Sequence, residues 1–387
     1  MDALLPRDVS AGARCRRRHE SLDRRCEAGS SLTFSVVFHD VMVVNQLGVK
    51  SVKIHVKPLA CTLLLASSFA AQHAYAQDQT IRVICNNWSG FAPVFVANDL
   101  GYFKQLGLNV SVKFDDEQAD ALAGIANGDV EVDMRTVDDY QRRPRRPSTP
   151  GVMIGTIDES NGGDGVVADG SIKTVADLKG KTVAMETDIP AYLLLQLELS
   201  KAGIGYKDLK IKQTAGSDAL SVFSDPGVAA IGTFQPFMNK AVELGKKRGA
   251  HILVSSASYP GTIVDAIIVN QTRLKANPQA YRGFLIGVYK AIAYYNAKPD
   301  AFIHLAAPHF SQTDEAFKAS IDGSLAYTSL DTAKRYFGSA ARPGSIYSTF
   351  DTLMKMNLAN GASDQTLSAA GSFDNSVLQS IHNADLK

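Results

Sequence analysis

The sequence predicts an α/β protein with doubly wound sheets, and two observations lead to that prediction. The first is the stretch 177–203, in which an apolar strand at 181–185 is followed by a short loop and a leucine-rich helix at 190–202. The second is the alternation of such strands and helices along most of the chain, which parallel sheets with helical crossovers require. An apolar fraction of 45% and a charged fraction of 20% fit a soluble globular protein.

Two strand–helix series are expected. The first has strands at 81–87, 109–114, 130–137 and 152–157, and the second has strands at 181–185, 209–214, 228–233 and 251–255, with helices at 190–202, 217–223 and 236–247. Beyond a short extended apolar piece at 265–270 the chain is predicted to be mainly helical. Extended segments near 166–168 and 266–269 would join the series as a hinge, which implies two lobes with a ligand cleft between them.

The amino-terminal part is predicted not to belong to either lobe. Residues 1–41 are rich in arginine and show no core, so they are a disordered extension or an over-long gene start ahead of Met42. Residues 42–76 read as a secretory signal peptide, because lysines precede an apolar run at 59–71 and a small-residue site allows cleavage after Ala76. We therefore expect lobe 1 at 77–166 plus 268–387, lobe 2 at 167–267, and a periplasmic location.

Charge and cysteine content narrow the function further. Residues 1–76 hold 10 of the 40 Lys and Arg and 6 of the 39 Asp and Glu, which leaves 30 basic and 33 acidic residues in the remainder. A mildly acidic body argues against nucleic-acid binding. Cys85 is the one cysteine after residue 76, so no intramolecular disulfide is expected there, and Cys85 is predicted to be a small buried side chain.

Polar and aromatic residues at strand ends supply candidate binding groups. Trp88, the only tryptophan of the chain, is either a core anchor or an aromatic cleft wall opposite Tyr192. Arg135 ends an otherwise apolar strand and needs a partner, which is either Asp138 or Asp158, or a ligand anion held in a bidentate way.

Two further groups of residues leave the charge of the ligand open. Asp158, Glu159 and Asp164 are either turn residues or acceptors for a cationic or N–H-rich ligand. Thr187 or Asp188 is expected to cap the helix at 190–202, whose positive end can hold a ligand. A zwitterion or a neutral amide would satisfy both an arginine and a set of carboxylates.

Four motifs together resemble a known family. WSGFAPVFVANDLGYFKQLGLNVSV, NGDVEVD, SIKTVADLKGKTVA and FQPF, in this order, are similar to the solute-binding proteins of ABC importers, in the branch of nitrate, sulfonate, taurine and thiamine-precursor pyrimidine binders. The resemblance spans about residues 80–340. It implies the two-lobed periplasmic-binding-protein fold (type II), with doubly wound sheets, a two-segment hinge and a solute bound in the cleft.

The resemblance also implies which residues line the cleft. They lie in the loop after the first strand, in the loop after the third, in the segment before the lobe crossing, at the start of the helix at 190–202, and in the FQPF motif: Trp88, Ser89, Phe91, Arg135, Thr136, Asp139, Asp158, Asp164, Thr187, Asp188, Tyr192, Phe234 and Gln235. Many members have an acidic Trp-Asp-Pro-Phe where this chain has Phe234 and Gln235.

The resemblance implies a small nitrogen- or sulfur-containing solute of the nitrate, sulfonate or taurine kind. An alternative is a urea- or guanidine-like solute, because a tryptophan motif paired with Asp158, Ser160 and Asp164 is similar to a sub-branch with such ligands. A pyrimidine solute, or an enzyme of the pyrimidine-synthesis kind, is a further alternative.

Other classes of function find less support in the sequence. His304 and His309 do not have the spacing of a helical metal pair, and none of the common hydrolase or phosphate-binding motifs is present. A transcriptional regulator of this fold would lack a leader and carry a DNA-binding helix pair. We therefore expect a monomer with no catalytic residue, no metal and no cofactor, whose partners are a small solute and an ABC permease in the inner membrane.

Overall fold

The computed structural model describes residues 79–115, 121–142, 151–187, 189–339, 341–363 and 365–387. The predicted extension at 1–41, the predicted signal peptide at 42–76 and Asp188 lie outside the described residues, so those predictions stay untested. No helix in the described ranges is long and apolar enough to cross a bilayer.

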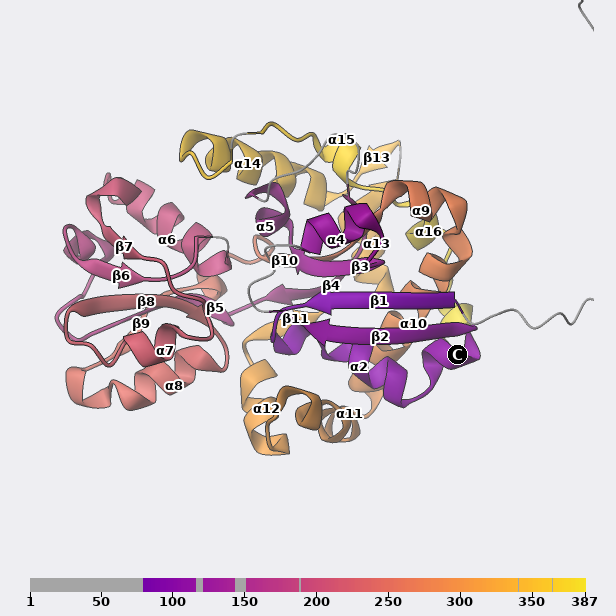
Figure 1. The fold of residues 1–387 in the computed structure, drawn as a ribbon, viewed down its shortest axis with the longest axis horizontal. Coiled ribbons are helices and arrows are strands. Elements are labelled where there is room, and N and C mark those ends of the chain that lie inside the picture. The colour runs from indigo at the N-terminus through magenta and orange to yellow at the C-terminus, as the bar shows by residue number, and fades with distance from the viewer. Residues whose placement is uncertain (1–78, 116–120, 143–150, 188, 340, 364) are drawn as a thin grey trace, which may run out of the picture. The chain divides into compact units, whose positions relative to one another are not determined.

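The first sheet has six strands and combines two parallel pairs with three antiparallel pairs. β1 pairs in parallel with β2 and with β3, whereas β10 runs antiparallel between β3 and β4, and β11 runs antiparallel to β4. In spatial order the strands are β11 (Leu325–Tyr327), β4 (Gly151–Ser160), β10 (Val264–Asn270), β3 (Val132–Thr136), β1 (Gln79–Cys85) and β2 (Leu108–Phe114) (Figure 1).

The second sheet has five strands from one continuous stretch of chain. β6 pairs in parallel with β7 and β8, and β5 runs antiparallel between β8 and β9. In spatial order the strands are β7 (Lys210–Lys212), β6 (Thr182–Ala184), β8 (Val228–Phe234), β5 (Asp164–Ala168) and β9 (His251–Ser255) (Figure 1).

Helices cover both faces of each sheet, as a doubly wound fold requires. On the first sheet α2 (Ala92–Asp99) and α10 (Pro278–Ala297) pack on one side. On the other side lie α4 (Ala121–Asn127), between β2 and β3 in the chain, and α5 (Val137–Arg142), directly after β3. On the second sheet α6 (Pro190–Lys201) covers one face, and α7 (Ala219–Val222) and α8 (Phe237–Leu244) cover the other. The predicted α/β fold class is confirmed.

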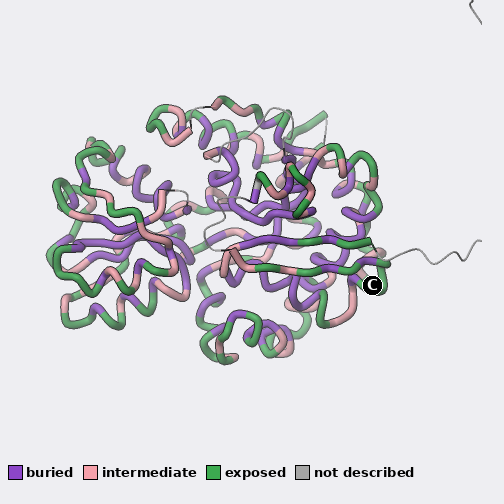
Figure 2. The backbone as a smooth tube through the Cα atoms, in the orientation of Figure 1, coloured by how far each residue is buried: buried purple, intermediate pink, exposed green. Residues whose placement is uncertain are grey.

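The core follows from the alternation of side chains along the strands. In β5, Val166 and Ala168 pack in the larger core with α6, whereas Val167 between them packs with α7 and α8. Cys85 is fully buried in β1, as predicted. Figure 2 shows the strands of both sheets as mostly buried under helices with exposed outer faces.

The carboxyl-terminal part is mainly helical, as predicted, and packs on the first sheet. The remaining helices and short turns are α3 (Tyr102–Gln105), α9 (Gln271–Ala276), α11 (Pro299–Ala306), α12 (Asp314–Ile321), α13 (Leu330–Phe337), α14 (Ser345–Ala359), α15 (Ala369–Ser372), α16 (Ser376–Gln379) and the 3-10 turns at 89–91, 175–178, 206–208, 246–248, 256–258, 307–310 and 383–386. A short hairpin, whose strands β12 (Gly338–Ser339) and β13 (Arg342–Pro343) have two residues each, precedes α14.

The predicted hinge positions are wrong. Residues 166–168 lie inside β5 and residues 266–269 lie inside β10, because both stretches are apolar on two sides and complete a sheet. The chain instead passes between the two sheets at 161–163 and at 256–263.

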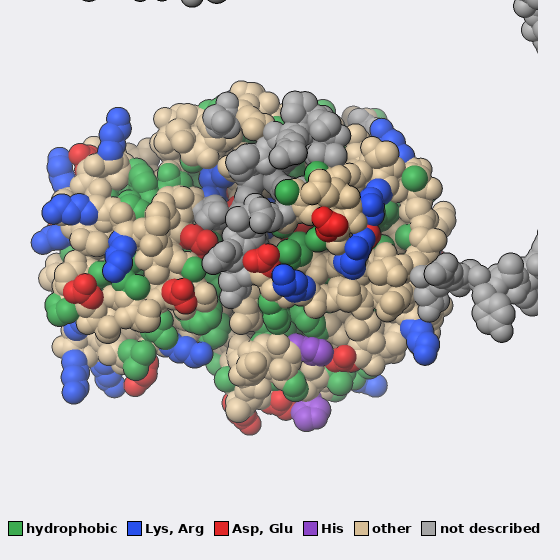
Figure 3. Space-filling view, in the orientation of Figure 1, with side chains coloured by type: hydrophobic (Ala, Val, Ile, Leu, Met, Phe, Trp, Pro, Cys, Tyr) green, Lys and Arg blue, Asp and Glu red, His purple; other side chains and the backbone are tan. Residues whose placement is uncertain are grey.

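Lysine side chains of the second sheet stand at its outer edge. Lys210 and Lys212 on the edge strand β7 are exposed, and Figure 3 shows Lys and Arg side chains spread over that end of the molecule. Charged side chains on an edge strand oppose pairing with another chain, so these lysines are explained without a ligand.

Candidate functional site

A buried row of polar side chains crosses the first sheet next to the point where the chain leaves it. Asp265 on β10 is the direct partner of Thr136 on β3 and of Asp158 on β4, and Tyr327 on β11 is the next partner of Asp158. Side chains of direct cross-strand partners stand on the same face of a sheet. Asp158 has no exposed surface and Asp265 is 4% exposed, so two carboxyl groups meet inside the protein.

Trp88 joins this row from the end of β1. Its indole Nε1 donates a hydrogen bond to Asp158 Oδ1 at 3.0 Å, and its ring meets the edge of Phe234 at 6.2 Å between centroids. Phe234 ends β8 of the second sheet. Two elements from different sheets therefore meet at Trp88.

Asp164 adds a third buried carboxyl group at the first residue of β5, where it is paired in register with Phe234. The Ser160 hydroxyl hydrogen-bonds this carboxyl and also lies 2.8 Å from the Ser256 hydroxyl. Ser256 Oγ accepts from the backbone N–H groups of Gly162 and Asp164, so its own proton points to Ser160. This chain of donors ends on Asp164.

The pKa of each of the three carboxyl groups is raised above that of an ordinary aspartate. Burial raises the pKa of Asp158 to about 7, and the negative charges of Asp164 and Glu159 act in the same direction. Hydrogen bonds from Trp88 and Asp265 act in the opposite direction. Burial likewise raises the pKa of Asp164 to about 7. Burial and the charges of Asp158 and Asp164 raise the pKa of Asp265 well above its usual value.

Among the residues that the structure describes, no cation pairs with the carboxyl cluster, which we define as Asp158, Asp164 and Asp265. In the described ranges, none of the hydrogen bonds or ion pairs of these three residues comes from Lys or Arg. The part of the chain that the structure describes also holds no group of three or more His, Cys, Asp or Glu arranged for a metal ion. The cluster can accept protons, or N–H donors from a solute.

Two glycines make room for the contact between Trp88 and Asp158. A Cβ atom at Gly90 would lie 2.2 Å from Trp88 Nε1 and 2.3 Å from Asp158 Oδ2. A Cβ atom at Gly163 would lie 2.3 Å from the Trp88 ring. The glycines of the WSG and SNGGD motifs are therefore required by side-chain space at the site.

The structure shows neither partner that we predicted for Arg135. The guanidinium pairs with Asp133 at 2.5 Å and with Asp139 at 3.0 Å, and its side chain is 1% exposed. Arg135 is the register partner of Ala266, one residue along from Asp265, so its side chain leaves the sheet on the opposite face from Asp158. This arginine already has two acidic partners within the protein.

Tyr192 does not oppose Trp88 in the way the sequence suggested. Its ring packs edge-on against Tyr206 at 4.6 Å, and the guanidinium of Arg142 lies 5.6 Å from its centre. Arg142 also pairs with Asp138 and donates to the carbonyl oxygen of Thr187. The aromatic partner of Trp88 is Phe234 instead.

The predicted cap of α6 is also wrong in its described part. The N-cap position is Ile189, two residues after Thr187, and no side chain caps the helix there. The Thr187 hydroxyl accepts from the Gln213 amide at 3.4 Å. Pro190 in the first turn lacks an N–H group, which reduces the need for a cap.

The remaining predicted residues have roles within the protein. Ser89 Oγ lies 2.9 Å from Ser320 Oγ, and the Ser89 carbonyl accepts from Tyr327, which fixes the loop next to Trp88. Phe91 is a core residue. Thr136 Oγ1 accepts from the backbone N–H of Asp139 at the start of α5. Gln235 bonds Asn239 at 2.9 Å, and its backbone N–H donates to Gly163 beside the cluster.

Sequence reasoning missed Asp265, Ser256 and Tyr327. A signal for Asp265 was present, because an aspartate stands second in the apolar strand VDAIIVN. A buried strand tolerates such a residue only with a partner. Nothing in the sequence distinguishes Ser256 or Tyr327 from ordinary loop and strand residues.

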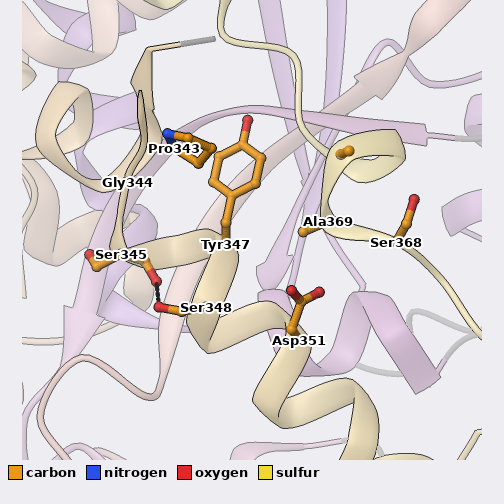
Figure 4. A pocket seen from close by; sticks show the side chains of 9 residues that line it. Pro343, Gly344, Ser345, Tyr347, Ser348, Asp351, Ser368 and Ala369 are labelled. Atoms are coloured by element: carbon orange, nitrogen blue, oxygen red, sulfur yellow. Dashed lines mark hydrogen bonds between the residues drawn. The ribbon is translucent and has the colours of Figure 1, made fainter. Parts of the chain in front are cut away.

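A hollow lies away from the predicted site, at the start of α14. It has a volume of about 610 Å³ and is lined by Pro343, Gly344, Ser345, Tyr347, Ser348, Asp351, Ser368, Ala369 and Ala370 (Figure 4). Asp351 is its one charged lining residue, and none of the predicted site residues lines it. Its wall includes Ser348, whose hydroxyl donates to the Ser345 carbonyl at 2.8 Å.

Known structures share this architecture. The chain superposes on the alkanesulfonate-binding protein SsuA of Xanthomonas axonopodis pv. citri bound to MOPS with a TM-score of 0.63, at 13% identity over 78% of this chain and 100% of that one. It superposes on the periplasmic nitrate-binding protein NrtA of Synechocystis PCC 6803 with a TM-score of 0.60, at 13% identity over 80% of this chain and 87% of that one. The protein therefore has the two-lobed periplasmic-binding-protein fold.

Sequence comparison then identifies the family. The family model described as NMT1/THI5 like matches residues 88–302, which is more than half of the chain. A protein of Brucella abortus, provisionally named a binding protein, is 24% identical over 261 residues, covering 65% of this chain and 78% of that protein. The chain belongs to the NMT1/THI5-like family, and the predicted relationship to nitrate- and sulfonate-binding proteins is confirmed.

Proposed function

We propose that this protein is an exported solute-binding protein of an ABC importer that captures a small, N–H-rich solute of the guanidine or urea kind. The observation that carries this proposal is the carboxyl cluster, three buried acids without a Lys or Arg partner among the described contacts. Buried carboxylates without donors are costly, and ionised carboxylates can only accept hydrogen bonds. A solute with several N–H groups supplies the missing donors.

The surroundings of the cluster support a flat solute. Trp88 and Phe234 bring two aromatic rings to Asp158 and Asp164, and aromatic faces bind planar cations well. The predicted site residues Trp88, Asp158, Asp164 and Phe234 would bind the solute directly. Tyr192, Thr187 and Arg135 would support the loops around them.

We further propose that the two lobes open and close around this cluster. The cluster is closed to solvent, so a solute needs the lobes to separate about the crossings at 161–163 and 256–263. The protein would act in the periplasm as a monomer, after loss of the leader, and deliver its solute to a membrane permease without chemical turnover. The protein NrtA, which has a similar fold and is named a periplasmic nitrate-binding protein, supports this setting.

A sulfonate, taurine or nitrate solute is the second candidate. The names of the similar structures favour it, and the ammonium group of taurine would suit the cluster. A bare anion is less well served, because the Arg135 guanidinium is occupied by Asp133 and Asp139.

A thermal-shift screen of the purified exported protein tests the proposal. Guanidinium, methylguanidine, urea and acetamidine at up to millimolar concentration are compared with nitrate, taurine, alkanesulfonates and pyrimidines. We expect an N–H-rich compound to raise the melting temperature, because a ligand at a hundredfold excess over Kd adds about 2.7 kcal/mol of stability.

Asp164→Asn should abolish that shift, and Asp322→Asn, which removes one exposed carboxylate on another element, is the matched control that should preserve it. A shift with sulfonates or nitrate alone would replace the first candidate with the second. No shift with any compound would contradict both.

A further inference from the structure

Asp265 stands behind Asp158 in the carboxyl cluster. The two residues are direct partners in the register of β4 and β10, and their carboxyl groups hydrogen-bond each other. Two carboxylates have no proton to share, so such a bond exists only when one group is protonated. Because the Trp88 indole donates to Asp158 Oδ1, Asp158 is the member of the pair that is stabilised as the ionised acceptor, which leaves Asp265 as the donor.

The charges around Asp265 keep its proton in place. The largest charges that act on it are acidic: Asp158 on β4, Asp164 on β5 and Asp139 on α5, the last of which is itself paired with Arg135. Glu159 adds a further negative charge next to Asp158. On β3 the register partner is the neutral Thr136, whose hydroxyl is used by Asp139. Ionising Asp265 would therefore add a buried negative charge among others.

Asp158 is otherwise held from one side only. The Trp88 indole donates to its Oδ1, whereas no N–H or hydroxyl group of the described residues donates to its buried Oδ2. A second donor is needed to fix the carboxyl plane, and Asp265 is the neighbour that offers one.

We infer that Asp265 is a positioning residue, whose carboxyl group donates a hydrogen bond to Asp158 and sets the orientation in which Asp158 meets the solute. This inference rests on the proposed function for its effect on binding. Asp265 itself does not touch the solute. The charges presented to the solute are then those of Asp158 and Asp164, which suits a monovalent guanidinium-type cation better than a neutral amide of the same shape.

Two variants of Asp265 separate a donor from a charge. Asp265→Asn keeps a donor in the same place, and Asp265→Ala removes it. With guanidinium chloride as probe and Trp88 emission as readout, we expect affinity within about threefold of wild type for D265N and at least tenfold weaker binding for D265A. Asp158→Asn is the reference for loss of a contacting charge.

Two results would contradict a positioning role for Asp265. An affinity of D265N as low as that of D158N would make Asp265 a third contacting charge. Unchanged affinity in both D265N and D265A would remove any positioning role.

A measurement without solute keeps the inference separate from the proposed function and from folding of D265A. The infrared C=O band of a protonated carboxyl should persist in the wild type at pH 8 and disappear in D265N. Its absence from the wild type would contradict the inference, whereas failure of guanidinium to bind would contradict the proposed function alone.

Discussion

Two buried groups of charges lie on opposite faces of the same sheet, and they differ in one respect. Around Arg135 the two aspartates, Asp133 and Asp139, are met by a guanidinium at 2.5 and 3.0 Å. In the carboxyl cluster the acids are met by an indole, by hydroxyl groups and by each other. The first arrangement is complete as it stands, whereas the second needs protons or a ligand. The difference is why we assign the first group a structural role and propose the second as the binding site.

Removing the cation from the group of Arg135, Asp133 and Asp139 should have the largest effect on stability. Arg135→Ala leaves Asp133 and Asp139 buried without their cation, and we expect a loss of about 3–5 kcal/mol in the free energy of unfolding. Denaturant unfolding measures it. Arg273→Ala is the control, because Glu131 keeps Arg82 as a partner and the pair is partly exposed, so we expect a loss of no more than about 1 kcal/mol. Equal losses would remove the distinction between the two groups.

The carboxyl cluster should make the protein less stable as the pH rises toward 7. The folded pKa of Asp164 is about 7, above the value of 3.8 for an unhindered aspartate, so its contribution is fully present at low pH and is lost as the pH rises to 7. For one such group the change is on the order of 4 kcal/mol. Unfolding of wild type and Asp164→Asn should be compared from pH 4 to pH 8.

We expect Asp164→Asn to gain stability relative to wild type as the pH rises, even though it loses solute binding. A parallel pH dependence of the two proteins would show that Asp164 is not buried as an uncompensated acid.

Binding should show the same titration. A cationic solute favours the ionised forms of Asp158 and Asp164, so its binding releases protons below pH 7 and its affinity falls up to tenfold per pH unit for each proton released. Calorimetry in buffers of different ionisation enthalpy counts those protons. An affinity that is constant between pH 5 and pH 8 would contradict a cationic solute at this cluster.

A smaller effect is expected at a polar contact between α14 and α6. The Asn360 amide donates to Gln196 at 2.9 Å, and Asn357 on the same helix bonds Asp138 and Gln141 of α5. The bond between Asn360 and Gln196 therefore reaches the helix that covers the second sheet, whereas the Asn357 bonds stay with the first sheet. Asn360→Ala should lower the free energy of unfolding by about 1 kcal/mol and weaken the free energy of solute binding by a comparable amount. A loss of stability without any change in affinity would mean that this contact does not take part in closure.

The fold was largely predictable, because its signals are local. Alternation of apolar strands with helices ending in glycine located most elements of both sheets, such as the strand at 251–255. The antiparallel strands β5 and β10 were less accessible, since an apolar run does not reveal its direction or its neighbours. Their wrong assignment to the hinge has that cause.

The site was predictable in its members more than in its pairings. Trp88, Asp158 and Asp164 are brought together as the motifs suggested, although their role in binding stays a prediction. Whether Arg135 faces Asp158 or the opposite side depends on strand register, which shifts a side chain by a whole face per residue. Asp265 was overlooked because it lies in a strand and outside every motif.

Gly90 and Gly163 make the contact between Trp88 and Asp158 recognisable from sequence alone. A methyl group at either place would collide with the indole or with the carboxyl that it holds. A relative that carries a larger residue at either position could not form this contact between an indole and a carboxyl group. Under the proposed function, these two positions would therefore separate relatives that use this site from relatives that do not.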